Sequence, residues 1–232
     1  MPIVATAGWS IPRTVADRFS TEGSGLARYA SVLPGVEINS TFYRRHKPST
    51  FARWAEAVPA HFRFAIKLAR HITHDRKLVE IEEPLRIFLD DIAPLGEKRG
   101  PLLCQLPPSL AFDAKVAEIA LTAMRKADAG SIVLEPRHES WGGQDAVELL
   151  DRLAIGRVMA DPPLVWTQLD FPRPPAYLRL HGTPKLYYSS YSDDDIAAFA
   201  SRLAADSWCV FDNTASGAAI ENALTMLDRL QA

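Results

Sequence analysis

Short apolar runs alternate along the chain with longer stretches whose apolar residues recur at helical spacing. Ile132-Val-Leu134 is typical of the runs, and Leu85, Phe88 and Ile92 are typical of the helical stretches. The runs predict strands, and spacings of three and four residues predict helices with one buried face. Strands separated by helices indicate parallel βαβ units. We predict eight strands, with centres near residues 5, 38, 65, 103, 133, 158, 179 and 210.

Eight such units predict a single (β/α)8 TIM-type barrel over residues 1–232. The alternative is an open doubly wound sheet, in which one switch point would collect the site. Many predicted strands end in a polar residue, and only a closed barrel brings all these ends to one opening. They are Glu37, Lys67, Gln105, Glu135, Asp161, His181 and Asp212. Since the chain has neither a GxGxxG motif after the first strand nor a P-loop motif, we expect no nucleotide cofactor.

Composition and charge narrow the functional classes. Hydrophobic residues make up 47% of the chain and charged residues 23%, as is usual for a globular protein with a full core. A net charge of −2 gives no electrostatic reason to expect nucleic acid or an anionic membrane as partner. The N-terminus lacks a signal-peptide pattern and no apolar run could span a bilayer, which predicts a cytoplasmic protein. Cys104 and Cys209 lie in predicted strands, so we expect both to be buried and reduced.

The fifth predicted strand runs directly into charged residues. Alternate strand residues share a face, so Val133, Glu135 and Arg137 point the same way. Barrel enzymes place their chemistry at the carboxyl ends of strands. We therefore predict Glu135, His181 and Lys67 as catalytic residues, with Glu135 as general acid or base and His181 as a proton shuttle. The other interpretation, that these charges form structural ion pairs, stays open; in both, Glu135 forms a salt bridge with Lys67, Arg137 or Arg179.

A second group of side chains near the strand ends is expected to bind a ligand: Glu37, Asn39, Tyr43, Gln105, Arg137, Arg179, Asp212 and Asn213. Asp212 and Asn213 must point to opposite faces of their strand, and alternation with Val210 favours Asp212 as the inward residue. The positive charge of Lys67, Arg137 and Arg179 disfavours a divalent cation in the same volume. We therefore predict no metal at this site.

Several motifs together resemble a known family. They are Val36-Glu-Ile-Asn-Ser-Thr-Phe-Tyr43, Phe64-Ala-Ile-Lys67, Ile72-Thr-His-Asp75, Gln105-Leu-Pro-Pro-Ser109, Glu135-x-Arg137-x-x-Ser140-Trp141, Leu178-Arg-Leu-His-Gly182 and Asp212-Asn-Thr214. In this order and over nearly the whole chain, they are similar to the YecE-like family, also called domain of unknown function 72. The resemblance implies a TIM-type barrel with a distant relation to sugar isomerases, and it supplies no established activity.

Two functional hypotheses follow. The first is an enzyme that binds a small polar ligand, sugar-like, anionic or phosphorylated, at the carboxyl-end mouth of the barrel and performs isomerase- or hydrolase-like acid–base chemistry. The second is a non-catalytic barrel that binds a ligand or a partner, with its charges mutually neutralised. A barrel fold alone does not decide between them.

Overall fold

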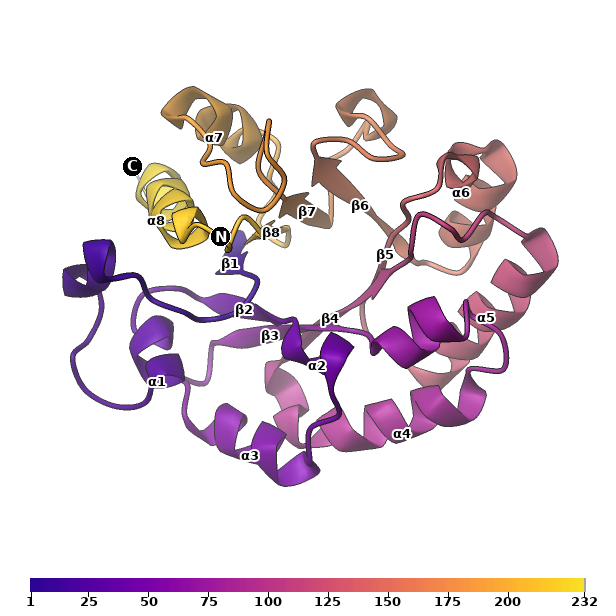
Figure 1. Cartoon of the computed structure of the whole chain (residues 1–232), viewed down its shortest axis with the longest axis horizontal. Coiled ribbons are helices and arrows are strands. Elements are labelled where there is room, and N and C mark those ends of the chain that lie inside the picture. Colours follow the sequence, from indigo (N-terminus) through magenta and orange to yellow (C-terminus); the bar gives the residue numbers. More distant parts are fainter. Residues whose placement is uncertain (232) are drawn as a thin grey trace.

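Eight parallel strands form the centre of the molecule. The structure is a computed structural model that describes residues 1–231. The strands are β1 (Ile3–Thr6), β2 (Gly35–Ile38), β3 (Arg63–Lys67), β4 (Arg99–Gln105), β5 (Ile132–Glu135), β6 (Gly156–Asp161), β7 (Tyr177–Leu180) and β8 (Trp208–Phe211). Their order in the sheet is β1-β8-β7-β6-β5-β4-β3-β2. All eight predicted strand centres lie within these strands (Figure 1).

The sheet curls until its two edge strands meet. β1 pairs in parallel with β8 over four residues, from Ile3 opposite Trp208 to Thr6 opposite Phe211. On the other side of β1, one parallel bridge joins Ala7 to Glu37, beyond the last residue of β1. There the amide of Gly8 donates to the carbonyl oxygen of Glu37 at 3.0 Å. The predicted (β/α)8 barrel is therefore confirmed, with its weakest seam between β1 and β2.

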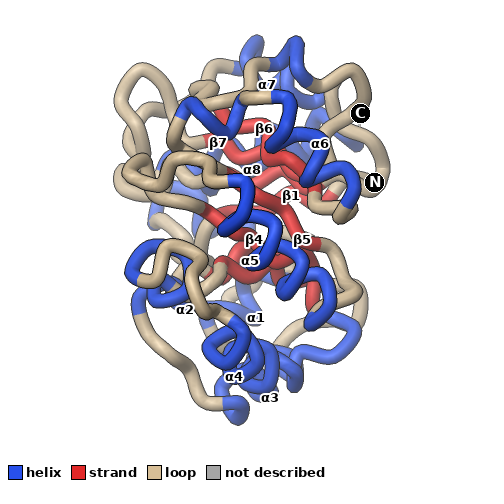
Figure 2. The backbone as a smooth tube through the Cα atoms, turned by 90° about the vertical axis from the view of Figure 1, so that its right-hand side faces the viewer, coloured by secondary structure: helices blue, strands red, loops and turns tan. Residues whose placement is uncertain are grey.

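Helices surround the strands, as Figures 1 and 2 show from two directions. They are α1 (Gly25–Ala30), α2 (Ser40–Tyr43), α3 (Pro48–Glu56), α4 (Glu82–Ile92), α5 (Ala114–Ala127), α6 (Gln144–Arg152), α7 (Asp193–Ala200) and α8 (Ala218–Gln231). Each longer helix buries an apolar stripe; α5, for example, buries Ala117, Leu121 and Met124. None of the helices within residues 1–231 is both long enough and apolar enough to cross a membrane.

Two apolar cores result from the alternation of side chains along the strands. The larger core lies between the strands and the helices, while the smaller one fills the barrel interior. Trp208 and Tyr177 stack within the interior core, with ring centroids 6.1 Å apart. Cys104 and Cys209 are buried and unpaired, as predicted, and burial raises the pKa of the Cys104 thiol to about 12.

Candidate functional site

A layer of charged side chains covers the interior apolar core. Two positions after Tyr177, on the same face of β7, Arg179 points into the barrel, and Glu37 and Glu135 enter from β2 and β5. All three side chains are almost completely inaccessible to solvent. A buried charge needs charged or hydrogen-bonding partners, because an isolated one costs several kcal/mol, of order 3–5 or more.

Arg179 lies at the centre of the layer and is the cationic partner of the buried carboxylates. Its guanidinium donates to the two carboxylate oxygens of Glu37 at 2.8 and 3.1 Å, and to Glu135 Oε2 at 3.0 Å. It also donates to Gln105 Oε1 at 3.3 Å and lies 3.0 Å from Asp212 Oδ2. Its planar fork of donors thus joins acceptors from β2, β4, β5 and the end of β8. Burial opposes the charge, but Asp212, Glu37 and Glu135 hold the pKa of Arg179 well above its usual value.

His181 bridges two of these carboxylates. Its Nδ1 lies 3.0 Å from Asp212 Oδ2, and its Nε2 lies 3.0 Å from Glu135 Oε1. An ionised carboxylate can only accept, so both ring nitrogens must donate, and the ring is then an imidazolium. Burial favours the neutral ring, but the Glu135 charge and the hydrogen bonds to Asp212 and Glu135 raise the pKa of His181.

The pKa values of the two carboxylates that flank His181 are lowered, whereas that of His181 is raised. Burial alone would raise the pKa of Glu135, but the charges of Arg179 and His181 hold it well below its usual value. The same two neighbours, against the same effect of burial, lower the pKa of Asp212. Both carboxylates are therefore ionised at neutral pH, which fits the protonated state of the ring between them.

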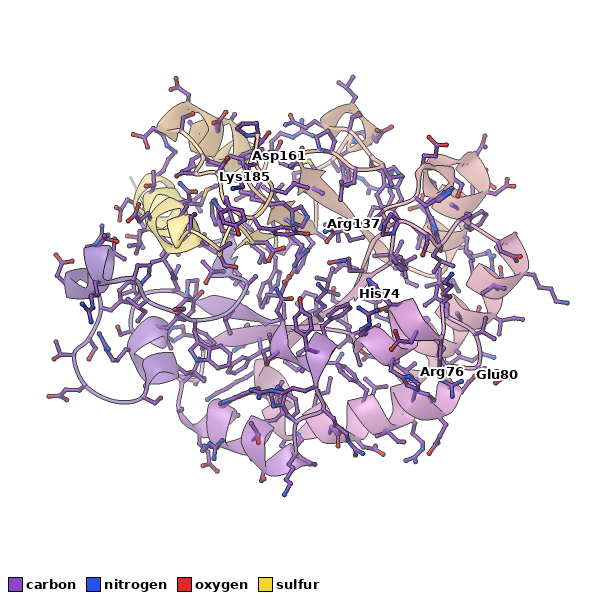
Figure 3. All side chains as sticks on the ribbon, viewed as in Figure 1. His74, Arg76, Glu80, Arg137, Asp161 and Lys185 are labelled. Carbon is purple, nitrogen blue, oxygen red and sulfur yellow. The ribbon has the colours of Figure 1, made fainter. Side chains whose placement is uncertain are left out.

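Arg137 and Tyr187 close the layer on the solvent side. Arg137 donates to Glu135 Oε1 at 3.0 Å and to the hydroxyl of Tyr187 at 3.1 Å. The ring of Tyr187 stands edge-on to His181, with centroids 5.7 Å apart. Figure 3 labels Arg137 just after β5, Asp161 at the end of β6, and His74 in the short helical segment His71–Asp75 that follows β3. The predicted salt bridges of Glu135 with arginine are present, to both Arg137 and Arg179.

Lys67 ends β3 at the same opening, but it is not part of the hydrogen-bonded network. Its Nζ lies 4.4 Å from the centroid of the Phe42 ring, a cation–π distance. His74 packs edge-on against the same ring. Burial, assisted by the charge of Arg179, lowers the pKa of Lys67 to about 8. Burial and the charge of Lys67 lower the pKa of His74 to about 4, so His74 is neutral at pH 7.

Two of the predicted binding residues contribute amide groups. Gln105, at the end of β4, accepts from Arg179. Asn39 Nδ2 lies 3.4 Å from Asp212 Oδ1, while the buried Oδ1 of Asn39 has no hydrogen-bond partner within residues 1–231. Asp212 is the inward residue of its pair, as the alternation of β8 predicted.

Tyr43, Asn213 and Asp161 are not bonded to the charged layer. Asn213 points outward, where its Nδ2 donates to Ser189 O and Asn222 Oδ1, because adjacent strand residues face opposite sides. Asp161 accepts from the Tyr191 hydroxyl at 3.0 Å and is not bonded to the charged layer. Tyr43 is the last residue of the short helix α2 and is 78% exposed.

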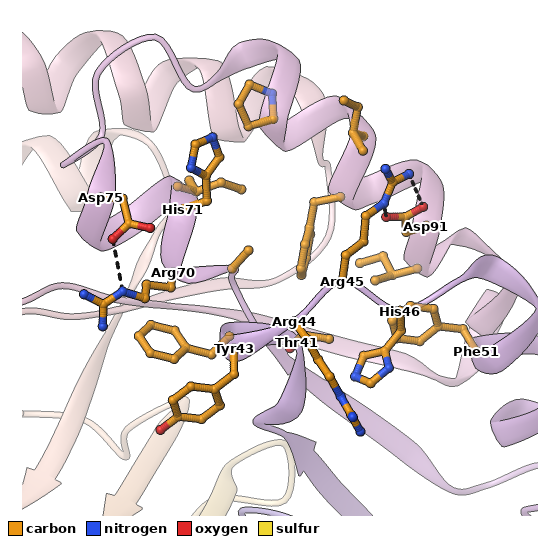
Figure 4. A pocket seen from close by; sticks show the side chains of 17 residues that line it. Thr41, Tyr43, Arg44, Arg45, His46, Phe51, Arg70, His71, Asp75 and Asp91 are labelled. Atoms are coloured by element: carbon orange, nitrogen blue, oxygen red, sulfur yellow. Dashed lines mark hydrogen bonds and ion pairs between the residues drawn. The ribbon is translucent and has the colours of Figure 1, made fainter.

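Tyr43 borders a separate cavity of about 380 Å³ outside the barrel. Figure 4 shows this cavity, with α4 along one side and the segment Thr41–His46 along another. Two ion pairs flank it, Arg45 with Asp91 and Arg70 with Asp75. The predicted ligand-binding role of Tyr43 stays a prediction.

Two aromatic residues of the site, Tyr177 and Phe42, were not predicted. Tyr177 donates its hydroxyl to Glu37 Oε2 at 2.7 Å, which completes the partners of that carboxylate. Alternation alone places Tyr177 on the face of Arg179 and could have identified it. Tyr187 and Phe42 lie in loop and short-helix segments, whose direction strand alternation does not predict.

The part of the chain that the structure describes has no cluster of three or more His, Cys, Asp or Glu side chains arranged to hold a metal ion. Glu135 and Asp212 already share His181 and Arg179 as partners. The chemistry that these residues can perform themselves is proton transfer and the binding of polar or charged groups.

Fold and site together define a (β/α)8 barrel with a charged layer at the carboxyl ends of its strands. A family model described as "Protein of unknown function DUF72" matches residues 3–232, and the chain belongs to this family. The resemblance drawn from the sequence motifs is thereby confirmed.

Curated relatives and solved structures agree with the assignment. The chain is similar to the UPF0759 protein YecE of Escherichia coli strain K12, with 32% identity over 99 residues, 43% of this chain and 35% of YecE. It is also similar to the UPF0759 protein YunF of Bacillus subtilis strain 168, with 27% identity over 149 residues. That match covers 61% of this chain and 52% of YunF, so the chain spans about a third to a half of these relatives.

Two solved structures of DUF72 family proteins share the fold. The protein from Thermotoga maritima MSB8 has a TM-score of 0.81 at 23% identity, over 100% of both chains. The protein from Enterococcus faecalis V583 has a TM-score of 0.81 at 22% identity, over 100% of this chain and 96% of that one. At these identities the likeness concerns the fold alone.

Proposed function

We propose that the chain binds a small polar ligand, sugar-like or anionic, at the carboxyl-end mouth of the barrel and performs acid–base chemistry on it. The observation that carries the proposal is the array Glu135–His181–Asp212, in which one imidazolium is held between two ionised carboxylates. A proton fixed in this way is available at neutral pH, and the carboxylate beside it can accept one. Isomerisation and hydrolysis both use such a pair.

The opening offers ligand contacts next to this array. Arg137 has a buried Nε without a partner in residues 1–231, and Tyr187 is partly exposed above His181. Lys67 adds an ammonium or amine group. A ligand hydroxyl or carboxylate at this position would complete hydrogen bonds that the protein alone leaves open.

A second candidate is a barrel that binds without catalysis. The burial of the central charges favours it: Arg179 is 0% exposed, Glu135 1% and His181 0%. Ion pairs buried to this degree also occur with a purely structural role, and they shift pKa values in proteins that catalyse nothing at that position.

A metabolite screen by thermal shift separates these candidates when wild type is compared with Glu135→Gln. The expected result is a compound that raises the Tm of wild type, fails to raise that of Glu135→Gln, and is converted by wild type when followed by NMR. The control is Glu118→Gln, which removes an exposed carboxylate paired with Arg152. Equal ligand shifts in wild type and Glu135→Gln would contradict the proposed site, whereas binding without conversion supports the second candidate.

A further inference from the structure

Lys67 differs from the other cations of the site because its amino group is uncommitted. Within residues 1–231 the Nζ has no hydrogen bond or ion pair, and it lies over the Phe42 ring, 4.4 Å from the ring centroid. The residue is 7% exposed, so it is largely removed from water. Its backbone is fixed, since the Thr41 hydroxyl donates to the carbonyl oxygen of Lys67 at 2.7 Å.

The charge balance of the layer does not require Lys67. Glu37, Glu135 and Asp212 carry three negative charges, and two arginines, Arg137 and Arg179, with the His181 imidazolium carry three positive charges. The sum is zero before Lys67 is counted. A charged Lys67 is therefore an excess cation in a largely buried environment, and its pKa near 8 leaves a substantial share of neutral amine close to physiological pH.

We propose that Lys67 is a nucleophilic amine that condenses with an aldehyde or ketone group of the ligand to form a Schiff base at the carboxyl end of β3. This inference rests on the proposed function, because it assigns a ligand class to the same site. Buried amines with no bonding partner are the lysines that react in this way.

The step balances with the groups present. The lone pair of Nζ forms a bond to the carbonyl carbon, and the carbonyl oxygen takes up a proton to give a carbinolamine. The carbon–oxygen bond then breaks, the oxygen leaves as water with a second proton, and the nitrogen gives up two protons in all. Amine and carbonyl compound thus yield imine and water, with no oxidant or reductant. The His181–Glu135 pair at the same opening is the donor and acceptor of these protons.

The competing role for Lys67 is that of a positive charge that binds an anion. The two roles separate in the Lys67→Arg variant, which keeps the charge but has no nucleophilic amine at neutral pH. If Lys67 acts only as a positive charge, Lys67→Arg should largely keep the binding of an anion. If Lys67 forms a Schiff base, the variant should form none.

The test is reductive trapping. Wild-type protein is incubated at pH 7.5 with glycolaldehyde, pyruvate or dihydroxyacetone phosphate in the presence of sodium cyanoborohydride, then digested and mapped by mass spectrometry. The expected adduct adds the mass of the probe less one oxygen atom, lies on the Lys67 peptide, and accumulates at least tenfold faster there than on the exposed Lys115 and Lys126. Lys67→Arg and Lys67→Met should lose this adduct.

The wild-type peptide map decides the question even if a variant fails to fold. Labelling spread over exposed lysines, without enrichment at Lys67 for any of the three probes, overturns the inference. If Lys67 is not trapped while Glu135→Gln still abolishes a ligand-induced shift, the Schiff base fails and the proposed function stands. If Lys67 is trapped equally fast in wild type and Glu135→Gln, the nucleophile stands and the acid–base role of Glu135 fails.

Discussion

Arg179 illustrates how one residue holds the charged layer together. It is fully buried and contacts three carboxylates, on Glu37, Glu135 and Asp212. Forming such a cluster yields little net stability, because desolvation of the charges offsets their attraction. Removing the central cation is nevertheless strongly destabilising, because three buried carboxylates then lose their shared partner.

Replacing Arg179 with methionine should therefore lower the free energy of unfolding by about 3–5 kcal/mol or more. The matched control is Arg152→Met, whose arginine pairs with Glu118 on the surface with 59% of its side chain exposed. That change should cost less than about 1 kcal/mol. Urea unfolding of the three proteins at pH 7 measures both values, and a similar small loss in the two variants would show that the layer is not held by Arg179.

Removing the charge of Lys67 is expected to stabilise the protein, in contrast to removing that of Arg179. Its pKa in the folded protein is about 8 instead of 10.5, so the folded state binds fewer protons than the unfolded state over that interval. Stability due to Lys67 therefore rises with pH between about 8 and 10.5, and at pH 7 the buried charge is a cost. The shift corresponds to about 3 kcal/mol as an upper value.

Lys67→Met should accordingly raise the free energy of unfolding at pH 7 by about 1–3 kcal/mol, with a smaller gain at pH 10. Lys115→Met, at an exposed position on α5, should change it by less than about 0.5 kcal/mol. A less stable Lys67→Met protein would mean that the amine is a structural partner, contrary to its assignment as a reactive group.

At the scale of elements, the strands were predictable and the connecting segments were not. Period-two alternation locates β1 to β8, helped by a proline or glycine after five of them (β1, β4, β5, β6 and β7). Alternation also orients Arg179 and Asp212 correctly. Tyr43 and Tyr187 show the limit. Each lies beyond its strand, where direction depends on tertiary packing that a local pattern does not contain. The spacing gave no means to predict that the Tyr187 ring stands edge-on to His181 or that Tyr43 is 78% exposed.

The base of the barrel depends on a close approach between strands and Trp208. A Cβ atom added to Gly100 on β4 would lie 2.6 Å from a ring carbon of Trp208 and 3.1 Å from the carbonyl oxygen of Phe64. Since Trp208 is itself packed against Tyr177, the ring has little freedom to move. A glycine is thus required here by space and not by backbone conformation.

Gly100→Ala should destabilise the protein by about 1–3 kcal/mol through overpacking. Gly25→Ala is the control, because a Cβ there meets no atom within 4 Å and the residue begins helix α1. It should be neutral or stabilising by up to about 1 kcal/mol. Thermal unfolding of the two variants measures the difference, and equal Tm values would contradict the packing described for the barrel base.

At the scale of the whole molecule, the barrel converts residues far apart in sequence into one charged layer. Glu37 and Arg179 are separated by 142 positions and share two hydrogen bonds. The closed topology follows from the eight repeated units, so the convergence of strand ends was predictable. The identity of the ligand was not predictable, because many unrelated activities use this fold and loop side chains determine which one a given barrel has.

The charged groups together predict how the stability of the molecule depends on pH. Glu135 and Asp212 have lowered pKa values, so their stabilisation is present above pH 4.5 and is lost as the pH falls through their folded values. His74, lowered to about 4, adds a rise in stability between pH 4 and 6.5. His181 acts in reverse: its pKa is raised above 6.5, so its contribution is complete below pH 6.5 and declines as the pH rises through the folded value.

Stability should therefore be highest near pH 6.5 and decline as the pH rises through the folded pKa of His181, until Lys67, whose folded pKa is about 8, loses its proton in the folded protein. Urea midpoints measured from pH 4 to 8 test this. His181→Gln should lose the decline above pH 6.5 even if it is less stable throughout, because the slope with pH reports the titrating ring and not the absolute stability. His61→Gln, an exposed control, should keep the decline. A wild-type profile that keeps rising from pH 6.5 to 8 would mean that His181 is neutral between its two carboxylates, and the proton assigned to the site would not be there.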